Sequence, residues 1–226
     1  MSFLEQVYPE LTTQGYSIIE NFLPNVSTVK AEVLNLLKNT QDDSTYKFGK
    51  ALRLGAISEN YSNSPNMAKV LDQEWMFSLA KKYLNRDKLF TEIFVTNDYR
   101  NDQGLEANGI LHFDKFHTLK YMLYLEDCNK SNGAFSVVPE SHIDGKFLRE
   151  KAWQQTEVYQ DIKNKPLNDY GEDFGYSEES VVALEGKAGT LIVFDTDTFH
   201  RGGVVEDGKE RLLIRSHFHD GSRWKR

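Results

Sequence analysis

The chain has 226 residues, of which 39% are hydrophobic and 27% charged, a composition typical of a globular protein with one substantial core. Its net charge of −7 at pH 7 argues against a nucleic-acid partner, because such a protein is not built to neutralise a phosphate backbone. The single cysteine, Cys128, excludes an intramolecular disulfide and a zinc–cysteine cluster.

The N-terminus lacks a basic start followed by an apolar run, and no 18-residue apolar stretch occurs. We therefore expect a cytoplasmic protein that does not span a membrane. We also expect it to be a monomer or a homodimer.

The N-terminal third of the chain predicts helices with short extended pieces. Residues 15–24 predict a short strand that ends at a proline. Apolar residues at a helical period predict helices over residues 25–39 and 66–84, and residues 47–57 have an extended, mixed character.

After Asn85 the sequence becomes rich in β-branched and aromatic residues, which favour strands. Strands are predicted, in chain order, over residues 89–99, 110–113, 118–125, 134–138, 181–184, 190–194 and 211–218. Short strands separated by Gly, Asn, Asp or Pro clusters are typical of a sandwich or barrel. About eight strands fit a double-sheet jelly roll.

The whole chain, residues 1–226, is predicted to form one α+β domain that is mainly β. Residues 1–85 supply supporting helices and strands, and residues 86–220 supply the jelly-roll core. Residues 145–159 are predicted to be partly helical. The polar segment 160–180 is a candidate lid loop, because a structureless loop of this length is uncommon unless it covers a binding site.

Three separated residues have the chemistry of a metal site: His112, Asp114 and His200. If residues 110–113 form a strand, His112 and Asp114 point to the same face, because side chains alternate along a strand. A distant third ligand completes a two-histidine, one-carboxylate face, which is diagnostic of non-haem iron(II) oxygenases. A polar pair on a half-exposed strand also explains the His-x-Asp triplet, so the metal interpretation depends on His200.

Two arginines follow His200 on the last predicted strand. Arg211, eleven positions after His200, offers a planar fork for the far carboxylate of a dicarboxylate. Arg215 is a rival on the same strand face, for which we prefer a surface position on an edge strand. Asp197 is a candidate acceptor that orients His200.

The order His-x-Asp, His and Arg resembles the Fe(II)/2-oxoglutarate-dependent oxygenase superfamily and, more narrowly, the phytanoyl-CoA dioxygenase (PhyH-like) family. Residues 15–24 resemble that family's opening strand. Residues 132–142 resemble its N-G-x-x-x-V-x-P-G-S-H segment, and residues 189–200 resemble its G-x-x-x-x-F-x-x-x-x-x-H segment. The resemblance extends from about residue 10 to about residue 220.

The resemblance implies a double-stranded β-helix, a form of jelly roll, and we expect the N-terminal helices to pack on one sheet of it. It implies that His112, Asp114 and His200 hold a catalytic Fe(II) and that Arg211 binds the 5-carboxylate of 2-oxoglutarate. The implied reaction uses dioxygen, releases succinate and CO2, and hydroxylates a small organic substrate. Asp114 favours hydroxylation over halogenation, because related halogenases lack this carboxylate.

Two positions depart from the family pattern. Glu140 replaces the glycine of the P-G-S-H segment, which leaves the backbone of that turn open. Gly202 stands where some members have a hydroxyl that contacts 2-oxoglutarate, and Tyr121 is the candidate that replaces this contact.

Two alternative classes stay open. A cupin, which is also a small metal-binding barrel, is expected to place a glutamate four or five residues after the second ligand, where this chain has Thr118 and Leu119. A non-catalytic ligand-binding jelly roll, or an inactive oxygenase relative, is less favoured because all four proposed metal and co-substrate residues are present.

Overall fold

The computed structural model describes residues 2–39, 44–46, 49–55, 64–71, 73–99, 111–114, 116–154 and 176–221. Most of the candidate lid loop, residues 160–175, lies outside these described residues. No helix of the described part is long and apolar enough to cross a membrane.

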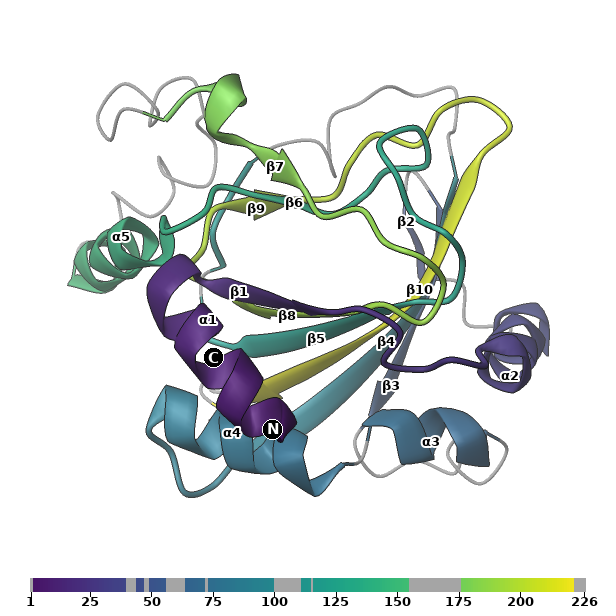
Figure 1. The fold of residues 1–226 in the computed structure, drawn as a ribbon, viewed down its shortest axis with the longest axis horizontal. Coiled ribbons are helices and arrows are strands. Elements are labelled where there is room, and N and C mark those ends of the chain that lie inside the picture. Colours follow the sequence, from purple (N-terminus) through teal and green to yellow (C-terminus); the bar gives the residue numbers. More distant parts are fainter. Residues whose placement is uncertain are drawn as a thin grey trace.

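Two antiparallel sheets face each other (Figure 1). The larger sheet has seven strands in the order β1-β8-β5-β10-β4-β3-β2, and the smaller has three in the order β7-β6-β9. The strands are β1 (Tyr16–Ile19), β2 (Ser44–Tyr46), β3 (Gly49–Gly55), β4 (Phe90–Tyr99), β5 (Leu119–Tyr124), β6 (Ser136–Val137), β7 (Val182–Ala183), β8 (Leu191–Asp195), β9 (His200–Arg201) and β10 (Glu210–His219). This architecture confirms the predicted jelly roll.

Strands from the beginning of the chain complete the larger sheet. β1 pairs with β8, and β3 pairs with β4, so the sheet extends beyond the segment 86–220 that was predicted to form the core. Figure 1 shows these early strands at the two sides of the sheet.

Four N-terminal helices pack against the outer face of the larger sheet, as predicted: α1 (Phe3–Gln14), α2 (Ser27–Asn39), α3 (Pro65–Leu71) and α4 (Glu74–Leu84). The predicted helix over residues 66–84 is thus two helices. α1 was not predicted, although Ser2 and Glu5 form a capping box at its start. A fifth helix, α5 (His142–Gln154), follows β6.

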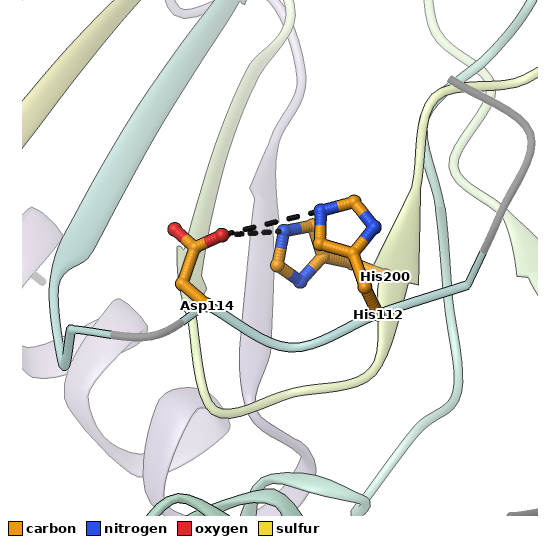
Figure 2. A group of neighbouring side chains, drawn as sticks. All are labelled: His112, Asp114 and His200. Atoms are coloured by element: carbon orange, nitrogen blue, oxygen red, sulfur yellow. Dashed lines mark ion pairs between the residues drawn. The ribbon is translucent and has the colours of Figure 1, made fainter. Parts of the chain in front are cut away.

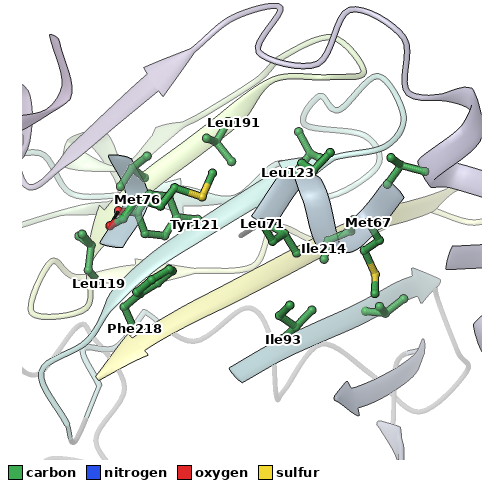
Figure 3. Close-up of a cluster of buried hydrophobic side chains, with 14 of the residues drawn as sticks. Met67, Leu71, Met76, Ile93, Leu119, Tyr121, Leu123, Leu191, Ile214 and Phe218 are labelled. Carbon is green, nitrogen blue, oxygen red and sulfur yellow. Dashed lines mark hydrogen bonds between the residues drawn. The ribbon is translucent and has the colours of Figure 1, made fainter. Parts of the chain in front are cut away.

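Strand β5 is buried on both faces because it lies between the helices and the smaller sheet. Leu119, Tyr121 and Leu123 face the helices, and Figure 3 shows them packed with side chains of α3 and α4. The alternate residues Met122 and Tyr124 face the smaller sheet. The second face of β5 therefore lies between the two sheets.

The backbone at Glu140, where the family pattern has a glycine, keeps the conformation of a glycine turn. Its φ of 67° is in the left-handed region that glycine adopts without steric cost, and its N–H donates to the carbonyl of Gln14 at 2.9 Å. The turn therefore keeps a glycine-like backbone around a larger residue, at a cost in conformational energy.

Replacing Glu140 by glycine should raise the free energy of unfolding by about 0.5–1 kcal/mol, because the left-handed strain of an L-residue exceeds the extra flexibility of glycine in the unfolded chain. Chemical denaturation measures the change. Glu140→Ala is the matched control: it removes the same carboxylate, keeps Cβ and should give no gain. Equal stability of the two variants would contradict the strain at this turn.

Candidate metal centre

The backbone brings the three candidate ligands together. His112 and His200 exchange two backbone hydrogen bonds, with N–O distances of 3.0 and 2.7 Å, and the N–H of Asp114 donates to the carbonyl of Thr196 at 2.9 Å. His112 forms an isolated bridge, so the described residues of the predicted strand 110–113 are not a regular strand. This pairing joins the His-x-Asp segment directly to the start of β9.

The three side chains converge on one point (Figure 2). Oδ1 of Asp114 lies 3.7 Å from Nε2 of His200 and 4.0 Å from Nε2 of His112. Ligands on adjacent metal positions are about 3 Å apart when the metal–ligand bonds are 2.0–2.2 Å. These two pairs need to close by about 1 Å or less, and the ligand atoms of all three residues lie within 4.8 Å of one another, so the donor set fits a metal ion of this kind.

His200 presents a neutral nitrogen to this point. Burial lowers its pKa to about 3, and Nδ1 lies 2.7 Å from the carbonyl oxygen of Thr198. A proton on Nδ1 would leave the lone pair of Nε2 directed at Asp114, the arrangement that metal-binding histidines use. The prediction that Asp197 orients His200 is therefore wrong, because Thr198 supplies the acceptor.

Asp114 is held as a carboxylate by its neighbours. Burial opposes its charge, but the ammonium group of Lys120 holds the pKa of Asp114 below its ordinary value. Nζ of Lys120 lies 2.5 Å from Oδ2, while Oδ1 faces the histidines. Lys120 thus fixes which oxygen is offered to a metal. Sequence reasoning missed it, although a single lysine within the buried run LKYMLY was the available signal.

A second group of polar side chains supports the turn before His200. Arg149 of α5 donates to both oxygens of Asp197 at 2.6 and 2.9 Å, and the N–H of Asp197 donates to Asp195 at 2.8 Å. Nε2 of His117 lies 3.0 Å from Asp195. The two aspartates therefore form the turn before His200, and the ion pair of Arg149 with Asp197 connects α5 to this turn.

A cavity of about 210 Å³ opens beside the ligands, between the two sheets. Its apolar wall includes Met122, Phe135, Phe194 and Leu213, and its charged lining residues are Asp98, Lys120, Arg211 and Arg215. The preference for Arg215 as a surface residue on an edge strand is wrong, because β10 lies between β5 and β4 and Arg215 lines the cavity.

Arg211 also lines this cavity, and part of its guanidinium already donates hydrogen bonds to the protein. Nε and Nη2 donate to Oδ2 of Asp98 at 3.1 and 2.7 Å, and Nη1 donates to the carbonyl of Gly133. An arginine has five N–H groups, so two are left for a ligand. The structure thus brings Arg211 to the cavity of the candidate metal ligands, together with a carboxylate partner, Asp98, that sequence reasoning missed.

Tyr121 lies on the opposite face of β5. Its side chain is fully buried against the helices, where its hydroxyl donates to the carbonyl of Met76 at 2.8 Å. Strand alternation directs it away from the cavity, so Tyr121 is wrong as a candidate contact to 2-oxoglutarate. The structure assigns it to the core.

The sequence profile of the phytanoyl-CoA dioxygenase (PhyH) family matches residues 11–211. The chain belongs to this family. The uncharacterised protein Rv1501 of Mycobacterium tuberculosis is 23% identical over 235 residues, which cover 95% of this chain and 75% of that protein.

Solved structures share the fold at low sequence identity. The carbocyclase SnoK from nogalamycin biosynthesis, described as non-haem and α-ketoglutarate-dependent, aligns with a TM-score of 0.70 and 16% identity over 98% of this chain and 85% of its own. The α-ketoglutarate-dependent epimerase SnoN of the same biosynthesis aligns with a TM-score of 0.66 and 18% identity, over 96% and 83%. SnoN has also been solved with Fe3+, α-ketoglutarate and nogalamycin RO.

We predict that His200→Ala lowers the affinity for a divalent metal by at least about a hundredfold, because even residues that only orient a ligand contribute 10- to 100-fold. His117→Ala is the control, since His117, Asp195 and Asp197 form the other metal-capable group among the described residues. It should cost less than about tenfold. Titration with Ni(II) measures both, and the reverse order of losses would place the metal at the second group.

Proposed function

We propose that this protein is an Fe(II)- and 2-oxoglutarate-dependent dioxygenase that oxidises a small organic molecule. The observation that carries the proposal is the convergence of two histidine nitrogens and one carboxylate oxygen beside a cavity that also holds Arg211. Three protein ligands leave three octahedral positions open, enough for a chelating co-substrate and dioxygen.

The metal ligands have distinct roles. His112 and His200 offer Nε2 to Fe(II), and Asp114 offers Oδ1 while its other oxygen stays with Lys120. When bound, iron with 2-oxoglutarate and dioxygen supplies the oxidising power, and the co-substrate is released as succinate and CO2. The chain itself binds, orients and excludes water.

Arg211 is the proposed anchor for the distal carboxylate of 2-oxoglutarate. Its two remaining N–H groups can form a bidentate pair, and Asp98 holds the guanidinium in place. The apolar wall of Phe135, Phe194 and Leu213 excludes water from the remaining space.

We propose hydroxylation as the outcome, because Asp114 occupies the coordination position that a halide needs in halogenation. SnoN is an epimerase and SnoK a carbocyclase, so this fold also accommodates reactions other than hydroxylation. No feature of the described residues favours a cupin or a non-catalytic jelly roll over this proposal.

The test is succinate release by the Fe(II)-loaded protein with 2-oxoglutarate and dioxygen, across a panel of small organic molecules. We expect slow release without a substrate and faster release with a suitable one. His200→Ala should abolish both. A protein that does not bind 2-oxoglutarate in the presence of the metal would refute the proposal.

Replacing Arg211 by lysine should weaken 2-oxoglutarate binding by about tenfold or more, because lysine keeps the charge and loses the planar fork. Calorimetric titration of the Ni(II)-loaded protein measures the change. The control is Arg86→Lys, an exposed arginine paired with Asp220. Unchanged affinity in a folded Arg211→Lys variant would exclude Arg211 as the anchor.

A further inference from the structure

The charges around the cavity cancel in pairs, with one exception. Lys120 is paired with Asp114, and Arg211 is paired with Asp98. Under the proposed function, a divalent metal and the 2-oxoglutarate dianion also cancel each other. Arg215 is then the charged lining residue whose charge no described lining residue, metal or co-substrate neutralises.

The contacts of Arg215 are weak for a half-buried guanidinium. Nη2 donates to the hydroxyl of Thr96 at 3.4 Å, and Nε is buried without a hydrogen-bond partner. The guanidinium carbon lies 5.6 Å from the centre of the Phe94 ring. Arg215 forms no ion pair with any described residue. An unpaired cation that is half-buried is partly desolvated at a cost, and an anionic ligand would reduce that cost.

The register of β10 places Arg215 nearer to the metal ligands than Arg211. His217 pairs with Lys120, which contacts Asp114, and Arg215 is only two residues from that level. Arg211 is four residues, about 13 Å, farther along the same strand. The farther arginine suits the distal end of a chelating co-substrate, and the nearer one lies where a substrate must approach.

We propose that the primary substrate is a small organic anion, with a carboxylate or a similar group that binds Arg215 through a bidentate pair. The inference rests on the proposed function, because 2-oxoglutarate must occupy its own position in the same cavity. It adds the chemical class of the substrate and the residue that selects it.

The remaining lining of the cavity indicates the polarity of the part of the substrate that does not bind Arg215. Met122 pairs with Arg215 across the sheet, and Phe135, Phe194 and Leu213 complete an apolar surface. A cavity of about 210 Å³ is smaller than pockets for drug-sized ligands. The substrate class is therefore a compact apolar body that carries one anionic group.

The experiment measures binding to the Ni(II)- and 2-oxoglutarate-loaded protein by calorimetry. The probes are butanoate, pentanoate, benzoate and phenylacetate, each with its neutral amide. We expect at least one carboxylate to bind at millimolar concentration or below, at least tenfold more tightly than its amide. Arg215→Gln should weaken that carboxylate at least tenfold and change the affinity for 2-oxoglutarate less than about threefold.

Two variants control for folding and for general charge effects. Arg86→Gln removes an arginine that does not line the metal-site cavity and should leave carboxylate binding unchanged. Arg215→Met should melt at or above the temperature of the unmodified protein without ligands, because it removes an unpaired half-buried charge. A large drop in melting temperature would instead assign Arg215 a structural role and overturn the proposal.

Two further results would overturn the inference and leave the proposed function intact. In the first, 2-oxoglutarate binds but no carboxylate is preferred over its amide. In the second, Arg215→Gln weakens 2-oxoglutarate at least tenfold, which makes Arg215 the co-substrate's anchor. If 2-oxoglutarate does not bind the unmodified loaded protein, the proposed function itself is refuted and the inference falls with it.

Discussion

The reciprocal backbone hydrogen bonds between His112 and His200 are the contact on which the site depends. They join two segments that are distant in sequence and fix the Cα positions of both histidines. The Asp114 N–H donates to the carbonyl of Thr196, which fixes the third candidate ligand beside them. Because backbone groups set this geometry, the side chains need only small rotations to enclose a metal.

Buried charges around these backbone contacts are arranged as pairs that each align a different element. Lys120 of β5 holds Asp114, Asp98 of β4 holds Arg211 of β10, and Arg149 of α5 holds Asp197. Such pairs contribute little net stability, because desolvation offsets their attraction, yet losing one partner is costly. Their main effect here is to set positions. Arg215 has no such partner among the described residues, and its unpaired positive charge is the reason that we expect the cavity to select an anionic substrate.

The sequence predicted the jelly roll and singled out His112, Asp114, His200 and Arg211, which the structure brings to one cavity, because these follow from local periodicity and from ordered motifs. It failed where the answer depended on which face of a strand is inside. Tyr121 and Lys120 are neighbours on β5, and only their pairing with β8 and β10 assigns one to the core and the other to the site. Arg215 was misjudged for a related reason: no local signal shows that β10 is central. Asp98 requires a partner 113 positions away.

A crystal structure of the protein with Ni(II) and 2-oxoglutarate tests the central claim most directly. The account predicts one metal bound by Nε2 of His112, Oδ1 of Asp114 and Nε2 of His200. It also predicts 2-oxoglutarate chelating that metal, with its distal carboxylate on Arg211. A metal bound instead by His117, Asp195 and Asp197, or 2-oxoglutarate bound away from the metal, would contradict it.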